Sequence, residues 1–131
     1  MSSTFLLDAN ALIALVIAEH EHHDRVAQWT AGVDTLVLCP ITEGAMVRYL
    51  VRSGETAASA MQLLRALRDS PKTDFWADSI SYADASLGHV VGHREVTDAY
   101  LASLAASHSE QLATLDEGLA CSLPRYVFLI P

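Results

Sequence analysis

The sequence is poor in cysteine, glycine and proline, and each shortage excludes a class of protein. Its 131 residues include 2 cysteines, 6 glycines and 4 prolines. Cys39 and Cys121 lie far apart and are not spaced for a zinc knuckle or a disulfide framework, which favours a reducing compartment. Few glycines and prolines in a chain that is 51% hydrophobic exclude a collagen-like, disordered or linker-dominated protein.

Long apolar runs are also missing. The longest run, residues 11–18, is shorter than the roughly 18 residues that a membrane span needs. The N-terminus lacks the basic region of a secretory signal, and Asp8 interrupts its first apolar stretch. We therefore expect a cytoplasmic protein without a membrane segment.

Positive charge is scarce. The chain has 8 Lys and Arg against 16 Asp and Glu, for a formal net charge of -8. This balance argues against a nucleic-acid binder that relies on charge alone, because such proteins are usually basic. It is compatible with a basic protein partner or with an acidic site that holds cations.

Strand and helix patterns alternate along the chain without a repeat or linker, so we expect one domain over residues 1–131. Apolar runs predict strands at 4–7, 35–39, 75–76, 112–115 and 126–130. Helices are predicted at 9–18, 23–31, 42–53, 56–69, 81–87 and 97–107. This alternation is typical of the α/β class, with a mostly parallel sheet covered on both faces.

Four acids are expected at one edge of that sheet. Asp8 and Asp116 directly follow predicted strands, and Glu43 and Asp98 lie in the first turns of helices. Functional sites of open α/β sheets gather at the carboxyl ends of the strands. Any one of these acids considered alone is more simply a turn former or a partner of the helix dipole.

Helical spacing changes that balance for Glu43 and Asp98, because each continues a stripe of apolar residues that should face the core. Unpaired carboxylates in such a place cost several kcal/mol each. Lys72 lies in a loop near Pro71, and no arginine is expected in the strand-end turns. A bound cation is the natural compensation, and an all-oxygen set of ligands suits Mg²⁺ or Mn²⁺.

Four segments carrying these acids resemble the PIN-domain ribonucleases, specifically the VapC-type toxins of bacterial toxin–antitoxin pairs. They are Leu-Asp-Ala-Asn at 7–10, Pro-Ile-Thr-Glu at 40–43, Val-Thr-Asp-Ala-Tyr-Leu at 96–101 and Leu-Ala-Thr-Leu-Asp at 112–116. Each segment alone is a weak signal. Their order and their spread over nearly the whole chain make the resemblance specific.

The resemblance implies an α/β/α sandwich and a Mg²⁺-dependent endoribonuclease, with Mn²⁺ as a possible substitute. The acids Asp8, Glu43, Asp98 and Asp116 would hold the metal, and Asn10 would support them and the metal-bound waters. Thr114 would have the same supporting role. The implied substrate is structured RNA such as tRNA or rRNA, and the implied partners are a second copy of the chain and a VapB-type antitoxin.

Several polar residues outside the four segments also have expected roles. Arg94, shortly before Asp98, is the candidate for a contact with RNA or with the antitoxin. Glu117 departs from the family pattern and is expected to point outward, although a water-mediated contact with the metal is an alternative. The histidines at 20, 22 and 23 lie among acids and fit a solvated loop better than a metal site.

Three alternatives remain open. A phosphoacceptor signalling domain would need a lysine at a strand end and a pair of acids after the first strand. A haloacid-dehalogenase-like phosphatase would need Asp-x-Asp where this chain has Asp-Ala-Asn at 8–10. The third alternative is a PIN fold that acts only as a binding module.

Overall fold

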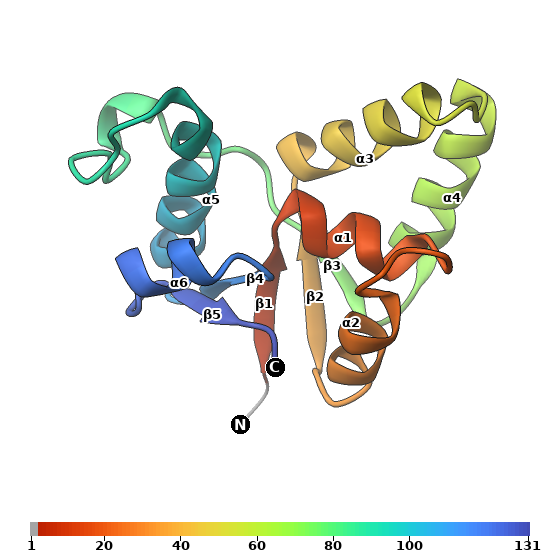
Figure 1. The fold of residues 1–131 in the computed structure, drawn as a ribbon, viewed down its shortest axis with the longest axis horizontal. Helices are drawn as coiled ribbons and strands as arrows, with labels where there is room; N and C mark the ends of the chain where they lie inside the picture. The colour runs from red at the N-terminus through yellow and green to blue at the C-terminus, as the bar shows by residue number, and fades with distance from the viewer. Residues whose placement is uncertain (1–2) are drawn as a thin grey trace.

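A five-stranded parallel sheet forms the centre of the computed structural model, which describes residues 3–131 (Figure 1). The strands are β1 (Thr4–Leu7), β2 (Thr35–Leu38), β3 (Thr73–Phe75), β4 (Gln111–Thr114) and β5 (Val127–Leu129). Their order across the sheet is β3-β2-β1-β4-β5, and every neighbouring pair is parallel. All carboxyl ends therefore lie at one edge, as the strand–helix alternation predicts.

Helices cover both faces of the sheet. They are α1 (Ala9–Val16), α2 (His23–Thr30), α3 (Pro40–Arg52), α4 (Ala57–Asp69), α5 (Val96–Ser107) and α6 (Glu117–Ser122). In Figure 1, α1 to α4 lie to the right of the sheet and α5 and α6 to the left. The predicted α/β/α sandwich is confirmed.

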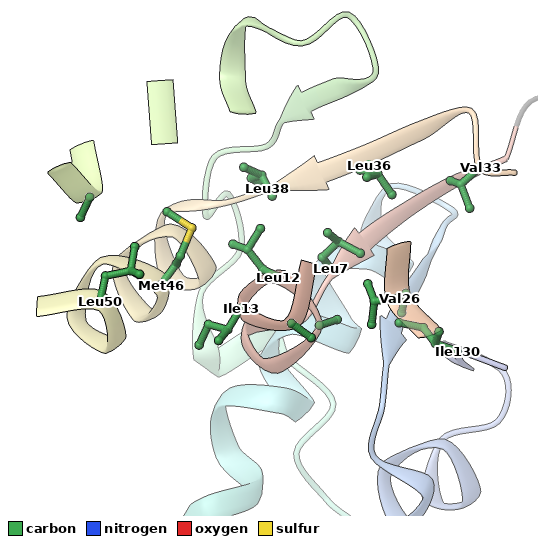
Figure 2. Packing of buried hydrophobic residues seen from close by; sticks show 14 residues of the cluster. Leu7, Leu12, Ile13, Val26, Val33, Leu36, Leu38, Met46, Leu50 and Ile130 are labelled. Atoms are coloured by element: carbon green, nitrogen blue, oxygen red, sulfur yellow. The ribbon is translucent and has the colours of Figure 1, made fainter. Parts of the chain in front are cut away.

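Alternation of side chains along each strand builds two separate cores. Leu7, Leu36 and Leu38 pack with residues of α1 to α4, as Figure 2 shows. Leu6 and Val37, one position along, pack on the opposite face with α5. Because both faces are buried, the strands are continuous apolar runs, which is typical of a parallel sheet.

The order of the strands places β1 at a topological switch point. From β1 the chain builds outward through β2 and β3, and it then returns along α5 to add β4 on the other side of β1. Ligands of open α/β sheets bind at such a point, outside the carboxyl ends of the two strands. Asp8 follows β1, and Asp116 follows β4 after one intervening residue.

One predicted helix is absent, and one short helix was not predicted. Residues 81–87 do not form a helix: a 3₁₀ turn at Tyr82–Asp84 ends at Ala85, whose backbone is extended. A second 3₁₀ turn, His93–Glu95, leads into α5. Most of this segment is exposed, so it lacks the buried face that stabilises a helix in a protein. The six-residue helix α6 was not predicted, because it is too short to show a period.

Helix boundaries also differ by a few residues. Helix α3 begins at Pro40 and not after Thr42; the Thr42 hydroxyl instead accepts a hydrogen bond from the Cys39 N–H at 3.2 Å. Proline suits this first helical position because its missing N–H would have no partner there. Gly54 lies just past the end of this helix with a φ of 103°, a left-handed backbone that glycine adopts without strain.

Within residues 3–131, no helix combines the length and the apolar character needed to cross a membrane.

Candidate active site

Asp8 lies at the centre of the candidate site, buried between the end of β1 and the start of α1. Its side chain is 3% exposed. One carboxylate oxygen, Oδ1, accepts a hydrogen bond from the Ala11 N–H at 2.7 Å and so caps α1. The other oxygen, Oδ2, accepts a hydrogen bond from the Thr114 hydroxyl. The carboxylate is therefore fixed by contacts from both α1 and β4.

The buried Thr114 hydroxyl connects two of the acids. It donates to Asp8, and it accepts a hydrogen bond from the Asp116 backbone N–H at 3.0 Å. The Asp116 side chain caps α6 by accepting from the Leu119 N–H at 3.1 Å. This chain of bonds holds the turn after β4 beside the end of β1. Thr114 is thus in contact with Asp8, while its role toward a metal stays a prediction.

Three of the predicted acids act on one another electrostatically. Burial is the main cause that raises the pKa of Asp8 from its ordinary 3.8 to about 6. Its hydrogen bonds act against this rise, and the negative charges of Asp98 and Asp116 add to it. Burial also raises the pKa of Asp98, as does the charge of Asp116. The structure therefore brings Asp8, Asp98 and Asp116 together.

Two of these acids, Asp98 and Asp116, line an open cleft, whereas Asp8 does not. The cleft has a volume of about 310 Å³, and its walls include Asp98, Asp116, Arg94 and His89. Arg94 thus lines the same cleft as two of the acids. The Asn10 side chain is exposed in the first turn of α1 and, within residues 3–131, makes no hydrogen bond to any of the four acids.

Glu43 has a different environment. It lies in the first turn of α3, and its Oε2 forms an ion pair of 3.6 Å with the Arg68 guanidinium of α4. An arginine therefore reaches one of the four acids, from α4 and not from a strand-end turn. Burial raises the pKa of Glu43, Arg68 opposes that rise, and the charge of Asp78 adds to it. The structure thus groups three acids at β1 and β4 and holds the fourth beside Arg68.

The donors present fit a divalent cation. All are carboxylate oxygens, the preferred ligands of Mg²⁺ and Mn²⁺. Within the described part of the chain, no group of three or more His, Cys, Asp or Glu side chains is already arranged to hold a metal ion. A cation would nonetheless offset the burial and the neighbouring negative charges that raise the pKa of Asp8 and Asp98. Glu43 Oε2 is buried without a hydrogen-bond partner among residues 3–131.

Among residues 3–131, the remaining candidate side chains form no hydrogen bond with the four acids. The His22 N–H donates to His20 Nδ1 at 3.0 Å, and His23 Nδ1 lies 2.8 Å from the Ala14 carbonyl oxygen, so these histidines make local contacts at the start of α2. Glu117 is exposed in the first turn of α6. Lys72 precedes β3 and bonds to the Thr30 carbonyl, far from the carboxyl edge that a phosphoacceptor domain requires.

Sequence reasoning missed several residues near the acids. His89 lines the cleft, but it lies in a segment without a pattern, and no signal marked it. Arg68 had a usable signal: it follows Ala60 and Leu64 at intervals of four and so continues the stripe of α4 that faces α3. Asp78 lies three residues beyond β3 and so near the same edge of the sheet.

Asp8 should make the cation-free chain less stable as the pH rises from 4 to 7. The folded state holds the Asp8 proton more tightly than the unfolded state, so the charged carboxylate costs stability above pH 6, and this cost disappears as the pH falls toward 3.8. Relative to Asp8→Asn, which cannot ionise at this position, we expect the wild type to lose about 1–3 kcal/mol over this range. The pH dependence is compared, and not the absolute stability, because Asn also lacks one of the two oxygens that accept hydrogen bonds. Urea unfolding of both proteins in EDTA between pH 4 and 7 measures the difference, and parallel pH profiles would contradict the raised pKa.

Comparison with known proteins agrees with this geometry. A family model described as PIN domain matches residues 5–121. Ribonuclease VapC29 of Mycobacterium tuberculosis is 54% identical over 98% of this chain and 97% of its own length. The crystal structure of M. tuberculosis VapC20, described as a sarcin–ricin loop cleaving toxin, superposes with a TM-score of 0.69 at 16% identity, covering 92% of this chain and 95% of its own.

FitAcB from Neisseria gonorrhoeae has the same fold. Its crystal structure superposes with a TM-score of 0.64 at 22% identity, over 95% of this chain and 96% of its own. The family match, the full-length relative and the site at the switch point together lead to one conclusion. This chain belongs to the PIN-domain family and, within it, to the VapC-type ribonuclease toxins.

Proposed function

We propose that the chain is a Mg²⁺- or Mn²⁺-dependent endoribonuclease and the toxin of a toxin–antitoxin pair, with structured RNA such as tRNA or rRNA as its substrate. The observation that carries this proposal is an open cleft lined by Asp98 and Asp116, whose charges also act on the buried Asp8. In metal-dependent hydrolysis of a phosphodiester, the cation polarises the attacking water, and neighbouring carboxylates are groups that attract such a cation.

The four acids would hold the cation, which when bound lowers the pKa of water and offsets the charge that develops on the phosphate. Asp8 is fixed by its bonds to Ala11 and Thr114 and so presents its carboxylate in one orientation. Asp98 and Asp116 face the cleft through which RNA would enter. No part of this scheme requires a nucleophilic serine or cysteine.

Arg94 would bind a phosphate of the substrate. Its place in the cleft wall beside Asp98 supports this role, because a guanidinium can hold a phosphate with two parallel hydrogen bonds. His89 in the same wall adds a second nitrogen donor. The Arg94 charge offsets part of the negative potential that the acids would otherwise present to RNA.

A VapB-type antitoxin would cover the same cleft. The formal net charge of -8 and the exposed acids of the cleft favour a partner with a basic side chain. Stoichiometric antitoxin should suppress RNA cleavage, and unchanged cleavage would contradict the partnership.

The proposal also includes a homodimer in the cytoplasm. The molar mass of the chain in solution, measured by light scattering, tests the dimer.

Replacing Asp98 with Asn tests the proposed activity most cleanly. Asp98 lines the cleft and, unlike Asp8 and Asp116, does not cap a helix, so the fold should be retained. We expect metal-dependent cleavage of total RNA to fall by about 100-fold or more. Gel analysis with Mg²⁺, Mn²⁺ or EDTA measures this loss.

The control for this experiment is Asp24→Asn, which removes an exposed carboxylate from the first turn of α2. It should cleave RNA at the wild-type rate. Full activity in the folded Asp98→Asn protein, or wild-type cleavage that persists in EDTA, would contradict the proposal. The melting temperature of each variant shows that the fold is intact.

Replacing Arg94 with Gln should weaken RNA binding and leave the chemical step nearly unchanged. A lost phosphate contact raises KM about three- to tenfold and lowers the salt dependence of binding by about one counterion. Arg52→Gln, at the exposed end of α3, is the matched control. Equal KM values and salt slopes for the two variants would remove Arg94 from the substrate site.

A further inference from the structure

The ion pair between Glu43 and Arg68 joins two helices at the edge of the candidate site. Glu43 belongs to α3 and Arg68 to α4, and the two helices pack against each other. The carboxylate is largely buried, with 14% of its side chain exposed, whereas the Arg68 side chain is 44% exposed. A buried acid is therefore neutralised by a cation that solvent can reach.

The pairing is incomplete. The 3.6 Å between Arg68 Nη1 and Glu43 Oε2 is too long for a hydrogen bond, and Oε2 is buried without such a partner in the part of the chain that the structure describes. A buried carboxylate oxygen is stabilised by a close hydrogen-bond donor or cation, so Glu43 Oε2 remains available to bind a cation. Arg68 offsets the charge of Glu43 without using its bonding capacity.

Arg68 is held from a second side. Its guanidinium lies over the Phe75 ring of β3, 4.3 Å from the ring centre, in a cation–π contact. The guanidinium therefore keeps a favourable position even if Glu43 takes another partner. Asp78 adds a second negative charge near Glu43, which further favours a positive partner for this carboxylate.

We propose that Arg68 is a positioning residue: it neutralises Glu43 while the site lacks a cation, and it competes with the incoming divalent cation for that carboxylate. This inference rests on the proposed function, because it takes Glu43 as a metal ligand. Loss of Arg68 should therefore have two opposite effects. The cation-free protein loses stability, and the affinity for the cation rises because a nearby positive charge has gone.

Mn²⁺ binding to the purified chain, measured by calorimetry without RNA, tests the second effect. Arg68→Gln should bind Mn²⁺ roughly two- to fivefold more tightly than the wild type, the change expected for one competing ion pair. Arg68→Lys keeps the charge and should bind like the wild type. Arg65→Gln removes the same charge from an exposed position on the same helix and controls for net charge.

A double-mutant cycle in EDTA tests the first effect without any metal. Arg68→Gln should melt at a lower temperature than Arg65→Gln, and adding Glu43→Gln should restore much of that loss because the unpaired buried charge is removed. A merely structural Arg68 would lower the melting temperature in both backgrounds equally and would leave Mn²⁺ affinity unchanged.

The outcomes separate the two proposals. Equal Mn²⁺ affinity in Arg68→Gln and Arg65→Gln, or weaker binding in Arg68→Gln, would overturn the role of Arg68 and leave the ribonuclease proposal standing. Absence of Mn²⁺ binding by the wild-type chain would overturn both proposals. Tighter binding in Arg68→Gln alone, with rescue by Glu43→Gln in EDTA, would support the competition.

Discussion

The hydrogen bond from the Thr114 hydroxyl to the Asp8 carboxylate is the contact on which the site depends. It joins the carboxyl ends of β1 and β4, the two strands between which the order of strand addition reverses. The same hydroxyl accepts from the Asp116 N–H and so holds the following turn close to β1. Two acids from distant parts of the sequence are thereby fixed at one edge, and α5 brings Asp98 to them.

This arrangement trades stability for chemistry. Burial and the neighbouring acids raise the pKa of Asp8 to about 6. At neutral pH the carboxylate is still mostly charged, and keeping that charge costs the folded chain stability relative to the unfolded chain. Part of that cost is offset because Asp8 and Asp116 each cap a helix. A bound cation would reduce the cost of these charged carboxylates. Many enzymes likewise carry destabilising features at their active sites.

The sequence predicts the position of some site residues and not of others. Asp8 and Asp116 follow apolar runs, and the carboxyl ends of parallel strands meet by geometry, so their proximity followed from local pattern alone. The spacing of Arg68 places it on the stripe of α4 that faces α3, but its pairing with Glu43 depends on how the two helices pack, which the spacing does not specify. The cleft wall that carries His89 comes from an irregular segment without a period to detect.

The central claim is that the acids at the end of β1 and β4 form a site for a divalent cation. A crystal soaked in Mn²⁺, with data collected near the manganese absorption edge, tests it directly. The account predicts an anomalous peak within ligand distance of Asp8, Asp98 and Asp116, and its loss in Asp98→Asn. No peak at this edge of the sheet, in crystals that bind Mn²⁺ elsewhere, would contradict the account.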